Sequence, residues 1–395
     1  MALFQYWLIE PTFLFSLIFL VIFLRIIFKL KPRKSSSLNL LPSPPKLPII
    51  GNLHQLSMNK PHISFHKLAQ KYGPIFSLQL GELPIVIVSS ARLAEEELFK
   101  NHDIALSNRP QIISAKHIFY NCTDIGFSPY GAYRMYIRKI CLAELLSTKR
   151  VQSFSFVREE EVARLVSRVV ESCPGTVSLS KLLGSFANNV VCRVAFGMNF
   201  TGGGDYDKPG VSEVDMFAAG TDTIFIALDW AMTELVMNPK AMEEAQAEVR
   251  SVVGKKRFVL ECDIPHMNYL KAVIKENYRL HPPAPFTAKR LFRGIDDPEI
   301  WEDPETFKPE RFIGSNIDFK GTNFELIPFG VGRRICPGMN FGTVSFELAL
   351  AQLLHSFDWE LPPDVTAKDL DMAEFFGITM HRKEGLVVLA KPHFL

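Results

Sequence analysis

The stretch Pro328-Phe-Gly-Val-Gly-Arg-Arg-Ile-Cys-Pro-Gly338 decides the interpretation of this chain. It places one cysteine, Cys336, at the end of a glycine-rich loop. Apolar side chains recur at helical spacing from residue 339 to about 356, which predicts a helix directly after the loop. Backbone amides and the positive end of the helix dipole then favour a thiolate at Cys336. With Arg333 and Arg334 beside it, this thiolate suits a large anionic cofactor with a metal at its centre.

Two plainer interpretations of the loop stay open at this point. A lone cysteine is most often a small buried apolar side chain. A glycine-rich loop before a helix can also bind phosphate. However, Gly330-x-Gly332 lacks the third glycine of the dinucleotide-binding motif, and no clear βαβ unit surrounds it. A dinucleotide-binding oxidoreductase is therefore the less favoured alternative.

Length and composition bound the class of protein. The chain has 395 residues, enough for a large core, and a net charge of +2, which gives no indication of nucleic-acid binding. Its six cysteines are scattered and form no Cys-x-x-Cys pair. This pattern fits a reducing compartment and indicates neither a disulfide framework nor a zinc site.

The N-terminus has the pattern of a membrane anchor. Residues 11–28 form an apolar run with one charge, Arg25, and as a helix they would span roughly 27 Å, close to the hydrocarbon core. Basic residues follow at 29–34, so the positive-inside rule predicts a single-pass anchor with the rest of the chain in the cytosol. A cleaved signal peptide is the weaker alternative, because the run is long and no small-residue cleavage site follows it. The prolines of 42–48 then predict a stiff hinge.

The remaining pattern predicts a mainly helical body with small β-sheets. Apolar β-type runs at 75–80 and 85–89 flank Gly81-Glu-Leu-Pro84, which predicts a hairpin with a four-residue turn. Further short strands are expected near 377–380 and 386–390. Additional helices are predicted at 92–100, 133–146, 151–171, 177–196, 215–236, 239–253 and 267–280.

The predicted helix 215–236 contains Ala219-Gly-Thr-Asp-Thr223 in its middle. A glycine and two threonines are unfavourable there on helix propensity alone. A tolerated kink, or a helix end at Gly220, is the plain interpretation. The alternative is an oxygen-binding notch, in which Gly220 opens room, Thr223 offers a hydroxyl group and Asp222 relays protons.

A second motif pairs Glu276 with Arg279 on one face of the predicted helix 267–280. An exposed ion pair would contribute little. Apolar flanks predict burial instead, and a buried pair needs further partners. Arg311, in Pro309-Glu-Arg-Phe312, can complete a structural triad.

Together these motifs resemble the signatures of the cytochrome P450 family. The spacing of Phe329, Gly332, Arg334, Cys336 and Gly338 matches that family's haem-binding signature. The notch, the Glu-x-x-Arg helix and the Pro-Glu-Arg-Phe segment precede it in the family's order. The resemblance implies a cytochrome P450 fold with haem b, in which Cys336 is the axial ligand of the iron. The cofactor-binding residues that it implies are Phe329, Gly330, Arg334, Cys336, Arg138 and Arg290.

The segment around Arg138 departs from the family pattern. Residues 130–141 are similar to the helix whose Trp-Arg-x-x-Arg pattern holds the haem propionates, but Arg134 and Met135 stand in place of the Trp and the first Arg. Arg138 keeps its place, and Arg290 matches another propionate ligand by its spacing.

The chain is also short for this family, with segments missing near 200–212 and after 290. Longer relatives have roof and channel helices at the first gap and a pocket-lining β-segment at the second. The predicted organisation is therefore a transmembrane anchor at 1–30, a basic and Pro-rich hinge at 31–50, and an incomplete haem-thiolate catalytic domain at 51–395.

The resemblance implies a plant microsomal enzyme of specialised metabolism, held in the endoplasmic reticulum membrane with its catalytic domain facing the cytosol. It would use O2 to hydroxylate a small apolar substrate, with a terpenoid as first expectation and a phenolic or lignan-type molecule as second. Electrons would come from NADPH through NADPH–cytochrome P450 reductase, and Thr223 and Asp222 would be catalytic. A truncated, non-catalytic haem-binding remnant is the main alternative, because of the missing segments. The substrate-contacting segments implied are 104–120, 217–221, 284–287 and 375–378.

Overall fold

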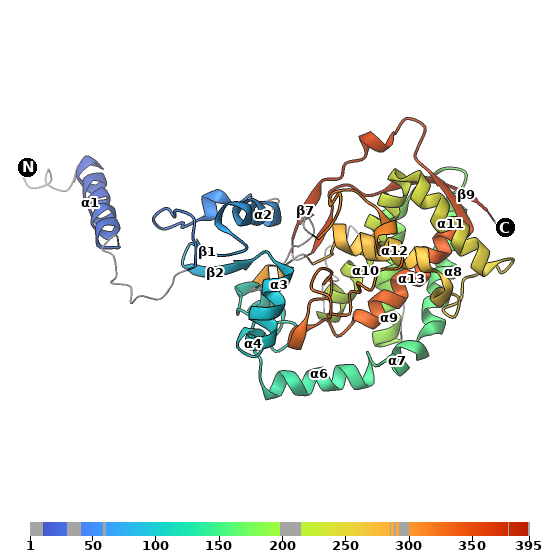
Figure 1. The fold of residues 1–395 in the computed structure, drawn as a ribbon, viewed down its shortest axis with the longest axis horizontal. Helices are drawn as coiled ribbons and strands as arrows, with labels where there is room; N and C mark the ends of the chain where they lie inside the picture. The colour runs from blue at the N-terminus through green and yellow to red at the C-terminus, as the bar shows by residue number, and fades with distance from the viewer. Residues whose placement is uncertain are drawn as a thin grey trace, which may run out of the picture.

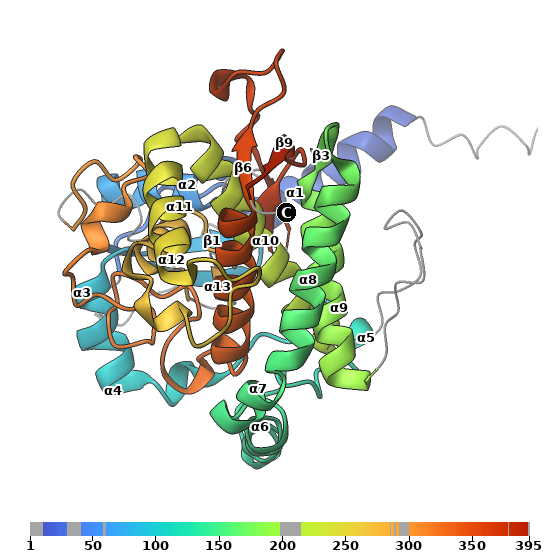
Figure 2. The ribbon, with the colours of Figure 1, turned by 90° about the vertical axis from the view of Figure 1, so that its right-hand side faces the viewer.

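The computed structural model describes residues 11–29, 41–57, 61–197, 215–284, 286–287, 290–291, 300–377 and 379–393. Within these ranges the chain is mainly helical, with small antiparallel sheets. In Figure 2, α13 lies between the pair α11 and α12 and the pair α8 and α9. The bounds of the central helices are α8 Ser155–Ser172, α9 Leu179–Phe196, α10 Asp215–Met237, α11 Pro239–Val253, α12 Asn268–Leu280 and α13 Met339–Ser356.

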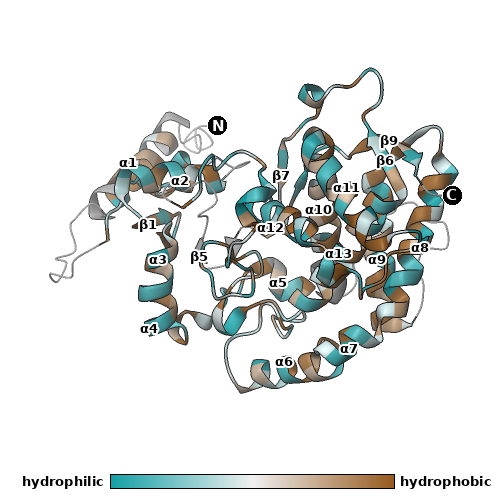
Figure 3. Cartoon of the chain, turned by 45° about the vertical axis from the view of Figure 1, so that its right-hand side comes forward, coloured by the Kyte–Doolittle hydropathy of each residue, from teal (hydrophilic) through white to brown (hydrophobic). Residues whose placement is uncertain are grey.

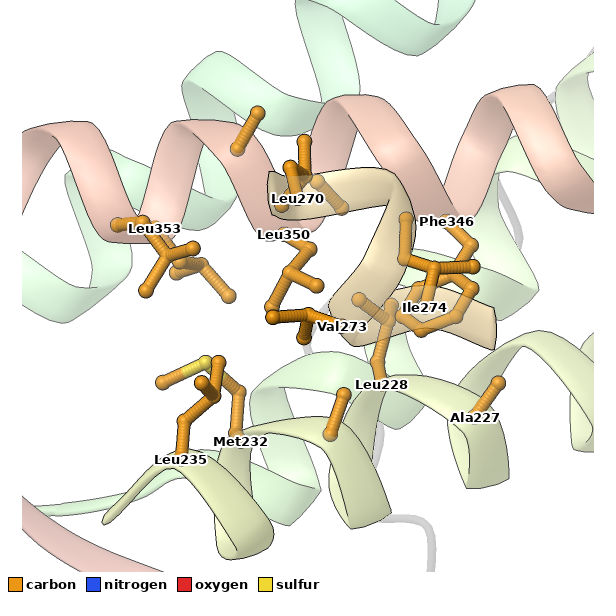
Figure 4. Packing of buried hydrophobic residues seen from close by; sticks show 14 of the residues in the cluster. Ala227, Leu228, Met232, Leu235, Leu270, Val273, Ile274, Phe346, Leu350 and Leu353 are labelled. Carbon is orange, nitrogen blue, oxygen red and sulfur yellow. The ribbon is translucent and has the colours of Figure 1, made fainter. Parts of the chain in front are cut away.

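The core forms where α10, α12 and α13 meet (Figure 4). Leu228 and Met232 of α10 face Val273 of α12 and Leu350 of α13, and all four side chains are fully buried. Each buried side chain of this size contributes about 1.5–3 kcal/mol relative to exposure. The apolar periodicity of these three helices therefore builds the scaffold on which the cysteine loop rests.

Most of the other helices lie beside this core, whereas α1 lies apart from it (Figure 1). Figure 3 shows that α9 is largely hydrophobic, whereas α4 is largely hydrophilic. Within the described residues, no helix has both the length and the apolar character that crossing a membrane requires. The bounds of these helices are α1 Pro11–Lys29, α2 Pro61–Tyr72, α3 Ala91–Leu93, α4 Lys100–His102, α5 Ile113–Ile118, α6 Ala132–Glu144 and α7 Thr148–Ser153.

The sheets are small and antiparallel. Strand β9 lies between β3 and β6, so the C-terminal strand joins the α8–α9 connection to the end of α13. The three strands of this sheet are β3 Thr176–Ser178, β9 Val387–Pro392 and β6 Phe357–Glu360. The other sheets have two strands each: β1 Ile75–Leu80 with β2 Leu83–Val88, β4 Phe286–Thr287 with β5 Arg290–Leu291, and β7 Glu374–Phe376 with β8 Met380–Arg382.

The predicted helices all form, and two of them are divided differently. The predicted helix 151–171 belongs to two helices, α7 and α8. The predicted helix 92–100 is irregular, because a π-helical stretch, Ala94–Phe99, lies between α3 and α4. The predicted helix 177–196 starts later than expected, because its first residues pair with the C-terminal strand as β3.

Two strand predictions were wrong in detail. The hairpin turn has two residues, not four, because Leu83 and Pro84 pair with Leu80 and Gln79. Gly81 takes φ +59°, a left-handed conformation that glycine adopts without strain. The strand expected at 377–380 is displaced: Gly377 and Thr379 lie between β7 and β8, and Met380 begins β8.

Candidate functional site

Cys336 lies in a folded loop that ends at the first turn of α13. The backbone N–H of Cys336 donates to the carbonyl oxygen of Phe329 at 2.9 Å, so the loop is closed around its own cysteine. Gly330 and Gly332 have φ of +70° and +67°, which only glycine adopts readily. The conformation of the loop therefore depends on its own glycines and its own hydrogen bond, as the glycine spacing predicts.

The sulfur of Cys336 is under opposing influences. Burial raises the pKa of the Cys336 thiol and is the largest effect. The backbone N–H groups of Gly338 and Met339 and the guanidinium of Arg138 lower that pKa. The predicted thiolate stabilisation by the helix N-terminus is thus present, but burial outweighs it. A metal cation at the sulfur would reverse this balance, because a coordinating thiol is deprotonated.

An aromatic cluster fixes the loop to the core. Tyr278 of α12 contacts Phe329 of the loop and Phe346 of α13 edge-on, with centroid separations of 5.3 and 5.6 Å. Burial raises the pKa of Tyr278, which keeps this phenol neutral. Gly332 lies close to the end of α4: a Cβ at residue 332 would be 2.7 Å from Oδ1 of Asp103. The cysteine loop is therefore packed tightly on two sides.

Four arginines gather beside the loop. Burial lowers the pKa of Arg109, Arg134, Arg138 and Arg334, and mutual repulsion between guanidinium groups adds to the effect for Arg134 and Arg334. For Arg334 the pKa falls to about 10. Within the described residues, Nε of Arg134 and Nη1 of Arg138 are buried without a hydrogen-bond partner.

This cluster fits a haem. Buried, unpaired guanidinium groups are costly unless an anion compensates them, and carboxylates pair with them best. Two propionate groups would supply the charge, and Cys336 the sulfur ligand. Arg138 acts electrostatically on Cys336, so the cationic cluster and the candidate iron ligand belong to one site.

Two predicted haem contacts have further features, and one arginine of the cluster was not predicted. Arg334 donates to the carbonyl oxygens of Ser107 and Ser128 at 2.6 and 2.7 Å, so it also ties the loop to the segment before α6. Arg290 has its backbone in β5, but its side chain lies outside the described residues. Arg109 was missed by sequence reasoning, since nothing in its spacing connects it with Arg138 or Cys336.

The α10 motif is continuous helix, so a helix end at Gly220 is excluded. A Cβ on Gly220 would lie 3.2 Å from Cγ2 of Val191, so this glycine allows α9 to approach α10 closely. The expected notch thus has a packing role that the motif alone did not reveal.

Asp222 accepts a hydrogen bond from the hydroxyl of Thr379 at 3.4 Å, and burial raises the pKa of its carboxyl group. Thr223 follows it, half-buried.

Glu276, Arg279 and Arg311 lie together beneath the site. Arg279 contacts both carboxylate oxygens of Glu276 at 2.7 and 2.8 Å, and Nε of Arg311 adds a bond at 3.0 Å. The three groups are almost completely buried. Their further bonds reach backbone carbonyls of residues 302–306. The triad therefore holds the chain after residue 300 against α12.

The fold and site define a haem-thiolate class of protein: a mainly helical scaffold with a half-buried cysteine in a glycine loop, and beside it a cationic cluster with unpaired guanidinium nitrogens. Comparison with known proteins agrees. The family model for cytochrome P450 matches residues 41–214, 210–295 and 291–389. The chain belongs to the cytochrome P450 family of monooxygenases, and the predicted family and mainly helical fold are confirmed.

Individual relatives sharpen this assignment. Cytochrome P450 71AP13 of Prunus mume is 52% identical over 498 residues, covering 98% of this chain and 96% of the relative. Cytochrome P450 71A1 of Persea americana is 40% identical over 461 residues, covering 87% and 91%. A zebra fish cytochrome P450 solved with abiraterone has the same fold, with a TM-score of 0.72 at 22% identity over 84% of this chain and 99% of its own. The chain is thus of the plant 71 type.

Proposed function

We propose that this chain is a haem-thiolate monooxygenase that hydroxylates a small apolar molecule of plant specialised metabolism. The observation that carries the proposal is the half-buried Cys336 in its glycine loop, beside a cationic cluster with unpaired guanidinium nitrogens. A terpenoid is the first substrate expectation and a phenolic or lignan-type molecule the second. Relatives named melianol synthase (Ailanthus altissima) and costunolide synthase (Cichorium intybus), each 36% identical to this chain, support the specialised-metabolism assignment.

The chain's own residues have distinct tasks in this reaction. Cys336 provides the sulfur ligand, and the amides of Gly338 and Met339 stabilise its negative charge. Arg134 and Arg138 hold the carboxylate side of the cofactor. When bound, haem supplies the redox chemistry that inserts one oxygen atom of dioxygen into the substrate.

Asp222 and Thr223 handle protons on α10. Burial raises the pKa of Asp222, which brings its carboxyl group nearer to exchange at neutral pH. The Thr379 hydroxyl bonds to this carboxyl group from the strand side, and Thr223 offers the next hydroxyl along the helix. We expect Asp222→Asn to slow product formation about tenfold or more, while the haem spectrum stays unchanged.

Electron supply and location complete the proposal. Electrons come from NADPH through NADPH–cytochrome P450 reductase, and residues 1–30 hold the enzyme in the endoplasmic reticulum membrane as a single-pass protein. The apolar side chains of α1 support a lipid contact, since Phe15 and Phe19 are 74% and 71% exposed. The basic residues at 29–34 and the proline hinge support a catalytic domain on the cytosolic side.

A non-catalytic haem-binding remnant is the second candidate. Apolar side chains of the expected substrate segment are left open, with Ile113 and Tyr120 each 76% exposed. The alignment with the Prunus mume relative spans 498 positions, more than the 395 residues present here, so that relative has internal segments that this chain lacks. Breaks in the family match near 210 and 291 support the placement of the missing segments.

A reduced carbon-monoxide difference spectrum of the full chain in microsomes tests the haem-thiolate site. We expect a thiolate-type Soret band that Cys336→Ala removes and that Cys262→Ala, at an exposed free cysteine, leaves intact. Absence of haem in the wild-type chain would refute the proposal. Turnover with reductase, NADPH and terpenoid or phenolic panels then separates enzyme from remnant, because the remnant binds haem without forming product.

A further inference from the structure

Arg382 of β8 is a buried charge to which the reaction described above gives no role. It is 5% exposed, and its Nη1 donates to Oγ1 of Thr233 on α10 at 2.9 Å and lies 4.0 Å from a carboxylate oxygen of Asp229. Burial lowers the pKa of Arg382, and the charge of Asp229 opposes that effect. A buried guanidinium group is unfavourable unless it is paired and bonded, so these contacts fix β8 to α10.

The α10 side of this contact is itself held in place. Thr233 donates its hydroxyl proton to the carbonyl oxygen of Asp229 at 2.7 Å, which leaves a lone pair for Arg382. Asp229 is 3% exposed and accepts a hydrogen bond from the hydroxyl of Ser180, at the start of α9. That hydroxyl accepts the backbone N–H of Leu386 at 2.5 Å. The end of β8 and the residue before β9 are therefore both anchored at one turn of α10.

The same stretch of chain reaches Asp222, the carboxyl group for which a proton role is proposed. Thr379 lies three residues before Arg382 and donates to Asp222 at 3.4 Å. An extended chain covers about 10 Å in three residues, and the seven helical residues from Asp222 to Asp229 also cover about 10 Å. The two contacts thus lie at matching distances along the hairpin and along α10. Fixing Arg382 fixes where Thr379 falls on the helix.

Both side chains that oppose the effect of burial on Asp222 belong to this stretch. Burial raises the pKa of Asp222, whereas the imidazole of His381 and the hydroxyl of Thr379 lower it. Both residues lie within three positions of Arg382. A displacement of β8 along α10 would therefore move both of them away from the carboxyl group.

We propose that Arg382 is a positioning residue for the proton-handling carboxyl group of Asp222. Held by Asp229 and Thr233, it sets the register of β8 on α10. That register brings Thr379 to Asp222. The inference rests on the proposed role of Asp222 and deepens it. It concerns contacts within the chain, so it can be tested without substrate, O2 or reductase.

The first measurement is hydrogen exchange in the purified full chain. The backbone N–H of Met380 donates to the carbonyl oxygen of Pro283 at 2.9 Å, so its exchange reports whether β8 keeps its place. Thr233→Val removes the hydroxyl that Arg382 bonds and changes no charge, and we expect exchange to become about tenfold faster. Where Arg382→Gln fails to fold, Thr233→Val still decides. Thr366→Val is the matched control, because it removes a hydroxyl group from an exposed threonine.

The second measurement follows the carboxyl group itself. Infrared difference spectra against Asp222→Asn identify the band of the protonated carboxyl group, which disappears as pH rises. Thr379→Val removes a group that lowers the pKa of Asp222, so this variant should keep the band to higher pH. We expect Thr233→Val and Arg382→Gln to do the same. In a chain that already carries Thr379→Val and His381→Gln, Thr233→Val should add nothing, because the side chains through which it acts are gone.

The outcomes separate positioning from stability and from the proposed function. Faster exchange in β8 with an unchanged titration of Asp222 would make Arg382 merely structural and overturn the proposal. A shift that Thr233→Val still produces after Thr379 and His381 have been replaced would overturn it too. A shift that depends on those two side chains supports the proposal even in a chain that forms no product. Normal product formation does not rescue it where the titration of Asp222 stays unchanged.

Discussion

Replacing Glu276 by glutamine removes one charge from the most deeply buried ionic group of the scaffold. Glu276 is 0% exposed and is bonded by both Arg279 and Arg311. The backbone N–H of Lys308 donates to the same carboxylate at 2.9 Å. A glutamine can keep some of these hydrogen bonds, but it removes the carboxylate charge that both guanidinium groups share.

The size of the effect follows from that geometry. Removing one partner of a buried ion pair costs about 3–5 kcal/mol, because the other charge stays buried without compensation. Domains are typically stable by only 5–15 kcal/mol, so the loss is a large fraction of the total. The aromatic contacts of Arg279 and Arg311 with Trp301 do not replace a carboxylate, because a ring face offers no hydrogen-bond geometry for the planar fork.

Urea unfolding, followed by tryptophan fluorescence, measures this loss. We expect the midpoint for Glu276→Gln to fall with little change in slope. Glu360→Gln is the control, because it breaks an exposed pair with Lys391 and should cost no more than about 1 kcal/mol. If the two variants unfold at the same denaturant concentration, the argument for a structural triad is refuted.

Two further predictions concern the loop and α13. Gly332→Ala should lower the urea midpoint more than Gly330→Ala. Both residues have positive φ, where an alanine side chain costs about 1–2 kcal/mol. Only at position 332 would the added Cβ also meet Asp103. Equal midpoints would contradict the close packing of the loop. Burial raises the pKa of Glu347 on α13 to about 7. The folded chain therefore binds the proton of this carboxyl group more tightly than the unfolded chain does. The contribution of Glu347 to stability is lost as pH rises from about 4.5 to 7. Glu347→Gln should flatten that decline in unfolding free energy, and a parallel pH profile would count against it.

The sequence predicts best what depends on neighbours along the chain. Apolar periodicity locates α10, α12 and α13 because each must bury one face against the others. The pair Glu276 and Arg279 lies within one helical turn, so its spacing already specifies its geometry. The glycines of the cysteine loop likewise predict positive φ angles, which the structure shows at Gly330 and Gly332.

What the sequence did not predict depends on residues that only folding brings together. Arg138 and Arg334 were predicted for the haem site from the resemblance, but Arg109 was not, because it comes from a separate segment that no spacing rule connects with theirs. Gly220 could not be linked to Val191 from sequence, because the contact is between two helices. The short strands β3 and β6 were missed for the same reason, since they exist only as partners of β9.

The distribution of contacts separates two properties of this chain, cofactor binding and turnover. The cysteine loop is held by Tyr278 of α12, by the start of α13 and by the carbonyls of Ser107 and Ser128, all within the described core. The expected substrate segment 104–120 contributes Ser107 to this support, but farther along it Ile113 is left 76% exposed. Because Ile113 takes no part in the first set of contacts, the cysteine loop does not depend on a roof over this part of the segment. Haem capture is therefore expected to survive in variants of this chain that lose turnover, and the converse should not be observed.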